Sequence, residues 1–114
     1  MKIKGLFFLL LVLVLSMSSC KKDKNIVKGT VTYVNLLGVE KVASGATIYL
    51  MVNDTDYEST TTTDADGKYE FNPVADGKYH VEGEITFSPV TYVGASEEFF
   101  AEKKDVIEAD LVLR

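Results

Sequence analysis

The sequence contains little of what most catalytic or metal-binding sites are made from. Among its 114 residues there is no tryptophan, one cysteine, one histidine and one arginine. A single cysteine cannot form a disulfide within the chain, and one cysteine with one histidine does not make a zinc cluster. Seventeen acidic residues outnumber twelve basic ones, giving a net charge of −5. The chain therefore lacks the basic excess that nucleic-acid binding requires.

Long hydrophobic runs are also scarce, apart from one near the N-terminus. Residues 6–15 are apolar throughout, follow Lys2 and Lys4, and precede the small or flexible side chains of 16–19. Ten residues are too few to span a bilayer as a helix, which takes about 20. A basic start, an apolar middle and a small-residue end predict a secretory signal peptide over residues 1–19. Its removal takes away two lysines and no acid, so the net charge becomes −7.

The cysteine lies directly behind this predicted signal. Met17-Ser18-Ser19-Cys20 resembles the lipobox of bacterial lipoproteins, with methionine where leucine is more common. The resemblance implies cleavage before Cys20, lipidation of its thiol, and a lipid bilayer as a partner. The alternative is an ordinary signal peptide with an incidental cysteine. Because a lone thiol in an oxidising compartment invites intermolecular pairing, lipidation accounts for Cys20 better.

Residues 20–25 are predicted to be the lipidated cysteine and a polar tether in front of a single folded domain at 26–114. Two or three acyl chains would anchor the protein permanently, because each buried methylene contributes about 0.8 kcal/mol. Lys21, Lys22 and Lys24 make the tether mostly basic. Surface-exported lipoproteins of Bacteroidota carry acidic residues at this place instead. We therefore expect an outer-membrane anchor with the domain facing the periplasm, and surface exposure as the alternative.

From residue 26 onward, apolar and polar side chains alternate with the period of two that is typical of strands with one buried face. Strands are predicted over 26–34, 46–52, 57–63, 68–71, 78–86 and 105–113, with 96–103 as a strand or a short helix. The segments 72–77 and 87–95 contain proline and glycine and are predicted to be a turn and mostly loop. Seven short segments separated by turns indicate an all-β protein, an antiparallel sandwich or barrel.

The same alternation predicts which side chains face inward. The expected inner set is Val27, Val31, Tyr33, Ala46, Ile48, Leu50, Val52, Tyr69, Phe71, Tyr79, Val81, Ile85, Ile107, Ala109, Leu111 and Leu113. Between them, His80, Glu82 and Glu84 are expected to face outward. The threonine-rich segment 57–63 has few core residues, which places it near the edge of a sheet.

The stretch Thr63–Phe71 is the most informative part of the domain. In Asp64-Ala65-Asp66-Gly67, the glycine allows a positive φ and an aspartate can accept hydrogen bonds from the turn backbone. The Asp-x-Asp spacing of Asp64 and Asp66 leaves a calcium loop as an alternative, as does that of Asp54 and Asp56. An EF-hand-like loop needs a third ligand and a distal glutamate, so a turn is the better interpretation, and no cofactor is expected.

These landmarks resemble those of carboxypeptidase regulatory-like domains. The shared features are Gly29-Thr30-Val31, Ser44-Gly45-Ala46-Thr47-Ile48, the stretch Thr63–Phe71 and Asp76-Gly77-Lys78-Tyr79. The resemblance implies a transthyretin-like, prealbumin-like fold, a seven-stranded antiparallel Greek-key sandwich. It also implies a non-catalytic accessory, adhesion or carbohydrate-system module, and hence no enzyme. Because the landmarks are turn glycines, turn acids and core aromatics, they specify the fold and not a ligand.

Four tyrosines, Tyr33, Tyr49, Tyr57 and Tyr92, could form a stacking platform for sugars. Tyr33 is predicted to face inward, which leaves Tyr49, Tyr57 and Tyr92 as the candidate ligand face. The segment 87–95 is a second place where recognition is expected, because binding residues concentrate on loops.

Two covalent or catalytic roles are known among relatives of this fold. Some collagen-adhesin B-type relatives form an intramolecular isopeptide bond, for which Lys28, Asp110 and Glu70 are the matching residues. All three are predicted to lie on solvated faces, which explains them more simply. Transthyretin-like hydrolases use His and Arg residues and end in a characteristic tetrapeptide that is missing here. A catalytic role would require His80 to pair with a carboxylate in a pocket.

The sequence therefore predicts a membrane-anchored lipoprotein whose β-sandwich is a non-catalytic binding or structural module. The alternative is an accessory subunit that binds glycans or contacts an outer-membrane transport system. In either case a protein or glycan partner is expected and nucleic acid is not.

Overall fold

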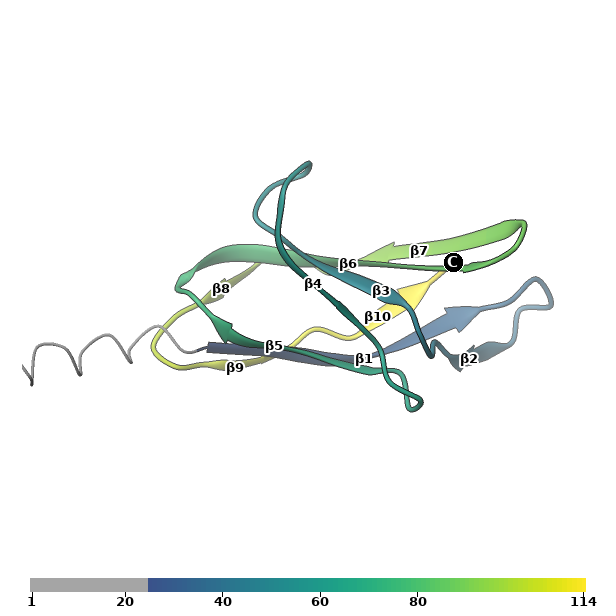
Figure 1. Ribbon diagram of the computed structural model, residues 1–114, viewed down its shortest axis with the longest axis horizontal. Helices are drawn as coiled ribbons and strands as arrows, with labels where there is room; N and C mark the ends of the chain where they lie inside the picture. Colours follow the sequence, from purple (N-terminus) through teal and green to yellow (C-terminus); the bar gives the residue numbers. More distant parts are fainter. Residues whose placement is uncertain (1–24) are drawn as a thin grey trace, which may run out of the picture.

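A computed structural model describes residues 25–114, which fold into two β-sheets packed face to face (Figure 1). The predicted signal peptide, Cys20 and most of the tether lie outside the described residues. Within the described part, every regular element is a strand, and no helix is long and apolar enough to cross a membrane. The prediction of an all-β sandwich is confirmed.

Each sheet has five strands. The first sheet contains β1 (Asn25–Val34), β2 (Glu40–Val42), β5 (Lys68–Val74), β9 (Val106–Glu108) and β10 (Leu111–Leu113). The second contains β3 (Thr47–Met51), β4 (Tyr57–Thr62), β6 (Gly77–Phe87), β7 (Val90–Ala95) and β8 (Phe99–Ala101). The count is thus ten strands where seven were predicted, because several segments expected as one strand or as loop form short separate strands.

The first sheet is organised around β1. Its first half pairs with β5 and β9, and its second half pairs with β2 and β10. The pairings with β9 and β10 are parallel. The expectation of a purely antiparallel sandwich is therefore wrong for this sheet, since the chain returns from the second sheet to run alongside β1 in the same direction.

The predicted last strand, 105–113, is interrupted where it passes β1. Ala109 donates its N–H to the carbonyl of Lys28 at 2.8 Å, and the Tyr69 hydroxyl donates to the carbonyl of Ala109. A Cβ on Gly29 would lie 2.3 Å from that carbonyl oxygen, so only glycine permits this approach. Asp110 then accepts the N–H of Thr30 at 2.8 Å. The chain bulges at Ala109 and Asp110, which divides the segment into β9 and β10.

The second sheet has the order β4-β3-β6-β7, with β8 on the other end of β6. The prediction of a loop over 87–95 is wrong, because Val90–Ala95 pairs in antiparallel fashion with β6. The segment 96–103, left open between strand and helix, contains strand β8. The predicted turn over 72–77 is shorter than expected, since β5 continues to Val74. In the segments 72–77 and 87–95, the pairing of neighbouring strands outweighs the local signal of a proline or glycine.

The core lies between the sheets and consists mainly of the predicted inner-facing residues. Its buried members are Val27, Val31, Ala43, Ala46, Ile48, Leu50, Tyr69, Phe71, Val74, Tyr79, Val81, Ile85, Tyr92, Ala101, Ala109, Leu111 and Leu113. One prediction fails at the end of β3, where Val52 is 45% exposed and Met51 is buried. The register between β3 and β4 shifts between Leu50 and Met51, which ends the alternation there.

The two long sides of the sandwich differ. On one side, Val93 of β7 exchanges backbone hydrogen bonds with Arg114, of 3.1 and 2.9 Å, which joins the second sheet to the end of β10. On the other side, β4 pairs only with β3 and β5 only with β1 (Figure 1). This open side is spanned by the Asp64–Gly67 turn that connects the two strands.

Candidate functional site

Five polar or aromatic side chains gather on the outer face of the second sheet. Strand β3 supplies Tyr49, β4 supplies Tyr57, and β6 supplies His80, Glu82 and Glu84. We call this set the tyrosine–glutamate face. Tyr49 and Glu82 are direct cross-strand partners, and Glu84 lies diagonally from Tyr49 beside Thr47. Pairing of the strands thus brings side chains more than thirty residues apart onto one surface.

Tyr49 and Tyr57 form the aromatic part of this face. The Tyr49 hydroxyl donates to Oε1 of Glu84 at 2.7 Å. This hydrogen bond to a carboxylate raises the pKa of Tyr49, because ionisation would place a second negative charge beside it. The Tyr57 ring meets the Tyr49 ring edge-on, with centroids 5.3 Å apart. Tyr57 is 57% exposed, so this pair presents an oriented aromatic surface to solvent.

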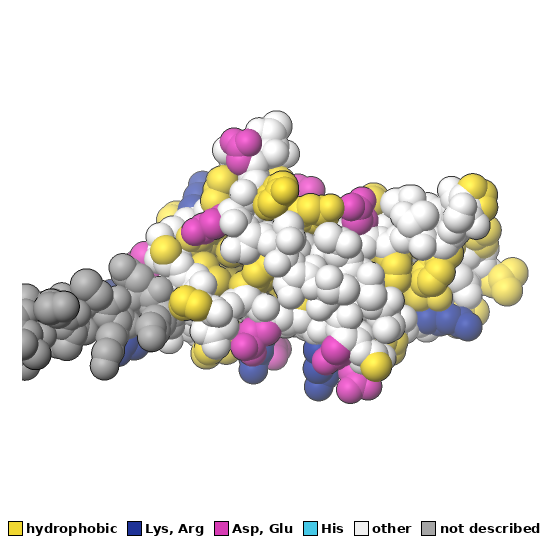
Figure 2. Space-filling view, in the orientation of Figure 1, with side chains coloured by type: hydrophobic (Ala, Val, Ile, Leu, Met, Phe, Trp, Pro, Cys, Tyr) yellow, Lys and Arg dark blue, Asp and Glu magenta, His cyan; other side chains and the backbone are white. Residues whose placement is uncertain are grey.

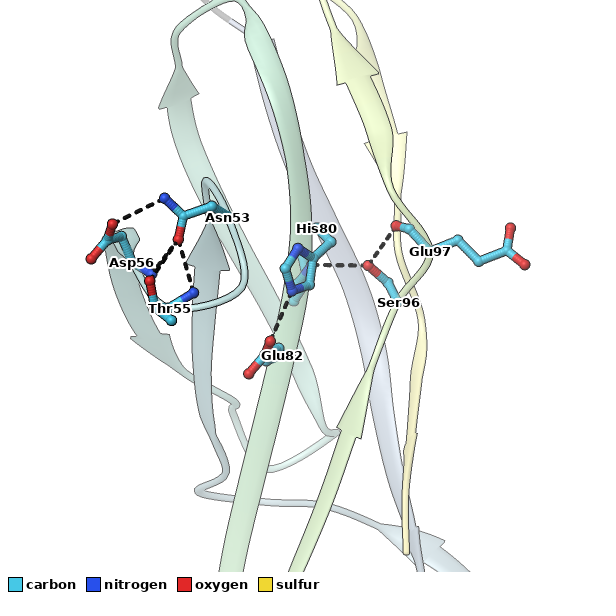
Figure 3. Close-up of polar contacts among 8 residues, drawn as sticks. Asn53, Thr55, Asp56, His80, Glu82, Ser96 and Glu97 are labelled. Atoms are coloured by element: carbon cyan, nitrogen blue, oxygen red, sulfur yellow. Dashed lines mark hydrogen bonds and ion pairs between the residues drawn. The ribbon is translucent and has the colours of Figure 1, made fainter.

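His80 and Glu82 form the second pair. Nε2 of His80 lies 2.8 Å from Oε2 of Glu82, and the His80 side chain is only 13% exposed (Figure 3). Beside His80 stands the turn that follows β3, whose shape is fixed by Asn53. Its Oδ1 accepts the N–H groups of Thr55 and Asp56 at 2.8 and 2.7 Å. The imidazole is therefore held by Glu82 on its own strand, and Asp54 of the turn lines the same hollow.

Two surface hollows follow this face. One, of about 380 Å³, is lined by Tyr49, Glu82, Gly83, Glu84, Val93, Gly94 and Ala95. The other, of about 500 Å³, is lined by Asp54, His80, Glu82, Ala95, Ser96 and Glu98. Because both include Glu82 and Ala95, they adjoin. The lining residues of the two hollows contain no lysine or arginine, so the surface they offer is acidic and aromatic.

A pair of glycines forms the floor of the first hollow. Gly83 and Gly94 are cross-strand partners on β6 and β7. A Cβ on Gly83 would lie 2.9 Å from Cδ1 of Ile48, and one on Gly94 would lie 2.7 Å from the carbonyl oxygen of Val112. The close approach of the Val112 backbone therefore requires glycine at position 94, whereas a Cβ at position 83 would displace the end of the Ile48 side chain. Both Cβ positions face the core, and on the outer side the backbone of the two glycines lines the hollow beside Tyr49, Glu84 and Val93.

A larger hollow, of about 580 Å³, lies on the open side between β4 and β5. Its lining residues are Lys28, Gly29, Thr30, Thr61, Thr62, Asp64, Lys68, Tyr69, Glu70 and Glu108. The aromatic residue among them, Tyr69, is 4% exposed and its hydroxyl is bonded to Ala109. Since no aromatic ring is open to a ligand there, the tyrosine–glutamate face is the better candidate despite its smaller hollows.

The structure separates the three tyrosines predicted to share a ligand face. Tyr49 and Tyr57 are together on the tyrosine–glutamate face. Tyr92 is 7% exposed and packs in the core against Tyr33 and Phe87, with ring centroids 5.3 and 6.3 Å away. Its inclusion in the ligand face was therefore wrong, because 87–95 is a strand whose alternation turns Tyr92 inward. His80, Glu82 and Glu84 were correctly predicted to face outward, but their sequence does not reveal that they meet the tyrosines.

The acidic turn Asp64–Gly67 has a structural role. Oδ1 of Asp64 accepts the N–H groups of Asp66 and Lys68 at 2.8 and 2.9 Å, and Gly67 has φ of +77°. The hydrogen bond from Lys68, followed by that from Asp66, lowers the pKa of Asp64. Among residues 25–114, no three His, Cys, Asp or Glu side chains are placed to hold a metal ion.

The residues considered for an isopeptide bond occupy exposed positions. Lys28 is exposed, and its cross-strand neighbours are Glu70 on β5 and Glu108 on β9. Asp110, the potential acceptor, uses Oδ1 to accept the N–H of Thr30. The arrangement is that of a solvated row of alternating charges, which stabilises pairing of the first sheet.

A catalytic role for His80 would require a carboxylate partner in a pocket. The structure meets this requirement in part, since His80 pairs with Glu82 beside a hollow. Ser96 is the hydroxyl in the same hollow, and its Oγ accepts the N–H of Val81 at 2.9 Å while donating to the carbonyl of Glu97 at 3.0 Å (Figure 3). Both functions of that hydroxyl are used by the backbone. In the described part of the chain, no hydroxyl nucleophile is bonded to the His80–Glu82 pair.

These observations define a class: a two-sheet β-sandwich with a polar and aromatic outer face. The model of the carboxypeptidase regulatory-like domain family matches residues 26–114, so the chain belongs to this family. No curated protein matches it in sequence. Among solved structures, it is similar to a Pseudomonas aeruginosa protein named as a candidate carbohydrate-binding protein. The TM-score is 0.62 at 14% identity, over 80% of this chain and 89% of that one, a likeness in fold.

Proposed function

We propose that this protein is a non-enzymatic carbohydrate-binding module, held at the outer membrane by a lipidated Cys20. The single observation that carries the binding role is the tyrosine–glutamate face with its two adjoining hollows. Membership of the carboxypeptidase regulatory-like family supports a non-catalytic role. The solved structure of similar fold, named as a candidate carbohydrate-binding protein, supports the choice of ligand class.

The chemistry of this face suits a sugar. The apolar C–H side of a pyranose packs on an exposed aromatic ring, which Tyr57 offers, while its hydroxyls donate hydrogen bonds to carboxylates such as those of Glu82 and Glu84. Ligand sites commonly combine such an apolar surface with a few well-placed polar groups. Because Tyr49 and His80 already hold the two glutamates by hydrogen bonds, little side-chain entropy is lost on binding.

The absence of basic residues from the lining favours an uncharged glycan. A uronic acid or a sulfated sugar would place its negative charge beside Glu82 and Glu84, without a cation among the lining residues of the two hollows. A neutral hexose oligosaccharide meets no such repulsion. The hollows follow strands β6 and β7, which suits an extended chain of several sugar units better than a single one.

The proposed anchor leaves this face accessible. The described chain begins at Asn25, at one end of the sandwich, whereas β6 and β7 run along its length (Figure 1). A tether from Cys20 to Asn25 therefore joins the domain at an end. The tyrosine–glutamate face lies on a flank, where a glycan can reach it from the side.

The binding role is tested by titrating the domain with neutral, amino and acidic oligosaccharides, followed by NMR and calorimetry. A neutral glycan is expected to shift resonances of Tyr49, Tyr57 and His80. Tyr57→Ala should then weaken binding about tenfold, equivalent to about 1.4 kcal/mol. The matched control is Phe100→Ala, which removes an aromatic residue that is 68% exposed and lines neither hollow.

Two results would contradict this proposal. One is a panel in which no neutral glycan perturbs the tyrosine–glutamate face. The other is an equal loss of affinity in Tyr57→Ala and Phe100→Ala, which would place the ligand elsewhere. Hydrolysis of a bound glycan that disappears in His80→Ala would overturn the non-enzymatic part alone.

The anchor is tested by Cys20→Ala in the full chain. This variant should lose acylation and cleavage before residue 20, so that the protein leaves the fraction that remains with membranes after a salt wash. Ser19→Ala keeps Cys20 and a small side chain before the cleavage site, and it serves as the control for changes to the signal region. Retention of Cys20→Ala in a lipid-labelled membrane fraction would show that the lipoprotein proposal is wrong.

A further inference from the structure

Strand β4 is an open sheet edge of unusual composition. It pairs with β3 on one side, and the strand pairings give it no partner on the other. Its sequence, Tyr57-Glu58-Ser59-Thr60-Thr61-Thr62, has one charge, no lysine and no proline, and is exposed except at Thr61. Edge strands with free backbone groups readily accept a further strand unless charged residues, prolines or bulges prevent it.

The other edge strands of the described sandwich have features that hinder the addition of a further strand. Strand β7 is covered by the backbone of Arg114. Strand β5 carries Lys68, Glu70 and Pro73, and a proline cannot donate to an added strand. Strands β2, β8 and β9 are three residues long. Among the strands of residues 25–114, β4 is therefore the longer edge without lysine or proline, and its regular part is Ser59–Thr62, because the register with β3 shifts at Glu58.

A hydrogen bond at the end of β4 shows in which direction the backbone groups of this strand point. Thr63 donates its N–H to the carbonyl of Ala46, so the backbone of residue 63 faces β3. Hydrogen-bonding direction alternates along a strand, and the register places Thr62 opposite Thr47 without a shift up to Ser59. The N–H and C=O groups of Thr60 and Thr62 therefore point away from β3, toward the open side.

We propose that β4 pairs with β4 of a second copy of this chain, antiparallel and related by a two-fold axis at Thr60. In this register Thr60 of one copy lies opposite Thr60 of the other, and both have outward-pointing backbone groups. Ser59 lies opposite Thr61, and the Glu58 residues of the two copies lie on opposite sides of the axis, so no two glutamates face each other. Threonine pairs across strands are favourable contacts, and a symmetric dimer needs such a self-complementary surface.

The two-fold axis is perpendicular to the sheet, so both copies present the same outer face. Tyr57 is part of β4, and its aromatic pair with Tyr49 would stand beside the pair of the second copy. The second sheets then form one continuous sheet with two tyrosine–glutamate faces on one side. If the proposed glycan role holds, the dimer binds a longer chain or two chains at once, with a gain in avidity.

The experiment is disulfide crosslinking of the full chain in its membrane, with Thr60→Cys. Opposed residues in a hydrogen-bonded antiparallel pair have Cα atoms about 5.5 Å apart, within the disulfide range of about 4.4–6.8 Å. Mild oxidation should yield a product of twice the chain mass that reduction reverses. The matched control is Thr91→Cys on the exposed face of β7, and the unchanged chain reports any crosslinking through Cys20.

The dimer band from Thr60→Cys should be several-fold stronger than that from either control. Adding Thr62→Pro should reduce it to the control level, because proline removes an outward-pointing N–H that β3 does not use, while the circular dichroism of the domain stays the same. A Thr60→Cys band no stronger than that of Thr91→Cys would overturn the proposal. A crosslink to a protein of different mass would also overturn it, since the partner would not be a second copy.

Discussion

The Asp64–Gly67 turn and the tyrosine–glutamate face both depend on carboxylates that accept hydrogen bonds, but they differ in the distance along the chain over which those bonds reach. Asp64 accepts from residues two and four positions away. Glu84 accepts from Tyr49, which is 35 positions away. A bond within a turn directs folding and is visible in the sequence. A hydrogen bond between strands exists only after the sheet has formed. Its side chains do not direct the folding of a turn, so they can contact a ligand.

Figure 2 shows a related contrast on the surface. Side chains of both charges lie side by side along the lower part of the view, while the upper part shows acidic side chains next to hydrophobic ones, with Lys or Arg visible at its left end. In the first sheet, opposite charges alternate across strands, as at Lys28, Glu70 and Glu108. In the tyrosine–glutamate face, the acids are paired with neutral or titratable partners. The first pattern stabilises a sheet, whereas the second leaves a net negative, aromatic surface.

The largest expected effect is on the turn. Gly67→Ala forces a Cβ into a backbone with φ of +77° and to within 2.6 Å of the Val31 carbonyl oxygen. Strain of this kind and overpacking each cost about 1–3 kcal/mol, so unfolding in urea should show a loss of about 2–4 kcal/mol. Gly38→Ala is the control, since it has a similar φ but no atom within 4 Å. An equal loss in both variants would mean that the crowding at Gly67 is unimportant.

A smaller effect on stability is expected from Asp64→Asn, and it should depend on pH. The pKa of Asp64 is lowered in the folded protein by two backbone N–H groups. Its carboxylate therefore adds stability above the unfolded-state pKa of about 3.9, and that stability is lost as the pH falls through the folded-state pKa. The difference in urea midpoint between the unchanged chain and Asp64→Asn should be full at pH 7 and vanish at low pH. Asp66→Asn is the control, and a difference that persists at low pH would contradict the assignment.

The smallest effect on stability, and the most local one, is expected from Glu84→Gln. This variant removes the negative charge that accepts the Tyr49 hydroxyl, so the pKa of Tyr49 should fall toward that of an ordinary tyrosine. NMR titration of the Tyr49 ring measures this change directly. The unfolding free energy should stay nearly the same, because the pair is at the surface. Glu102→Gln, an exposed acid off this face, is the control, and a Tyr49 titration unaffected by Glu84→Gln would contradict the hydrogen bond.

Much of the fold could be predicted because local signals and pairing agree along most strands. The alternation in 26–34 and 78–86 gave the inner faces correctly, and Asp64 and Gly67 marked their turn. The failure at 87–95 has a clear physical cause. Pro89 and Gly94 suggest loop, but Gly94 is required by the close approach of the Val112 carbonyl inside a strand. Whether a glycine ends a strand or makes room for a neighbour depends on contacts that are distant in sequence.

The candidate site was only partly predictable for the same reason. Tyr49 was expected to be exposed from its place between Ile48 and Leu50, and it is on the surface. Tyr92 was misplaced because its strand was not recognised. His80, Glu82 and Glu84 were assigned the correct face, but the register of β3 with β6 sets Tyr49 beside Glu82 and within reach of Glu84. Register depends on the whole sheet. The alternation in a single sequence therefore predicts which side chains share a face, but not which of them are cross-strand neighbours.

The parallel pairing of β1 with β9 and β10 has a consequence for how the chain is made. The first strand of the domain pairs with the last one, and their partner residues Val31 and Leu111 are 80 positions apart. Such distant contacts form late in folding, because the intervening loop must close first. The first sheet cannot be completed while the chain is still emerging N-terminus first. The first sheet of this domain can therefore be completed only after β9 and β10 are available.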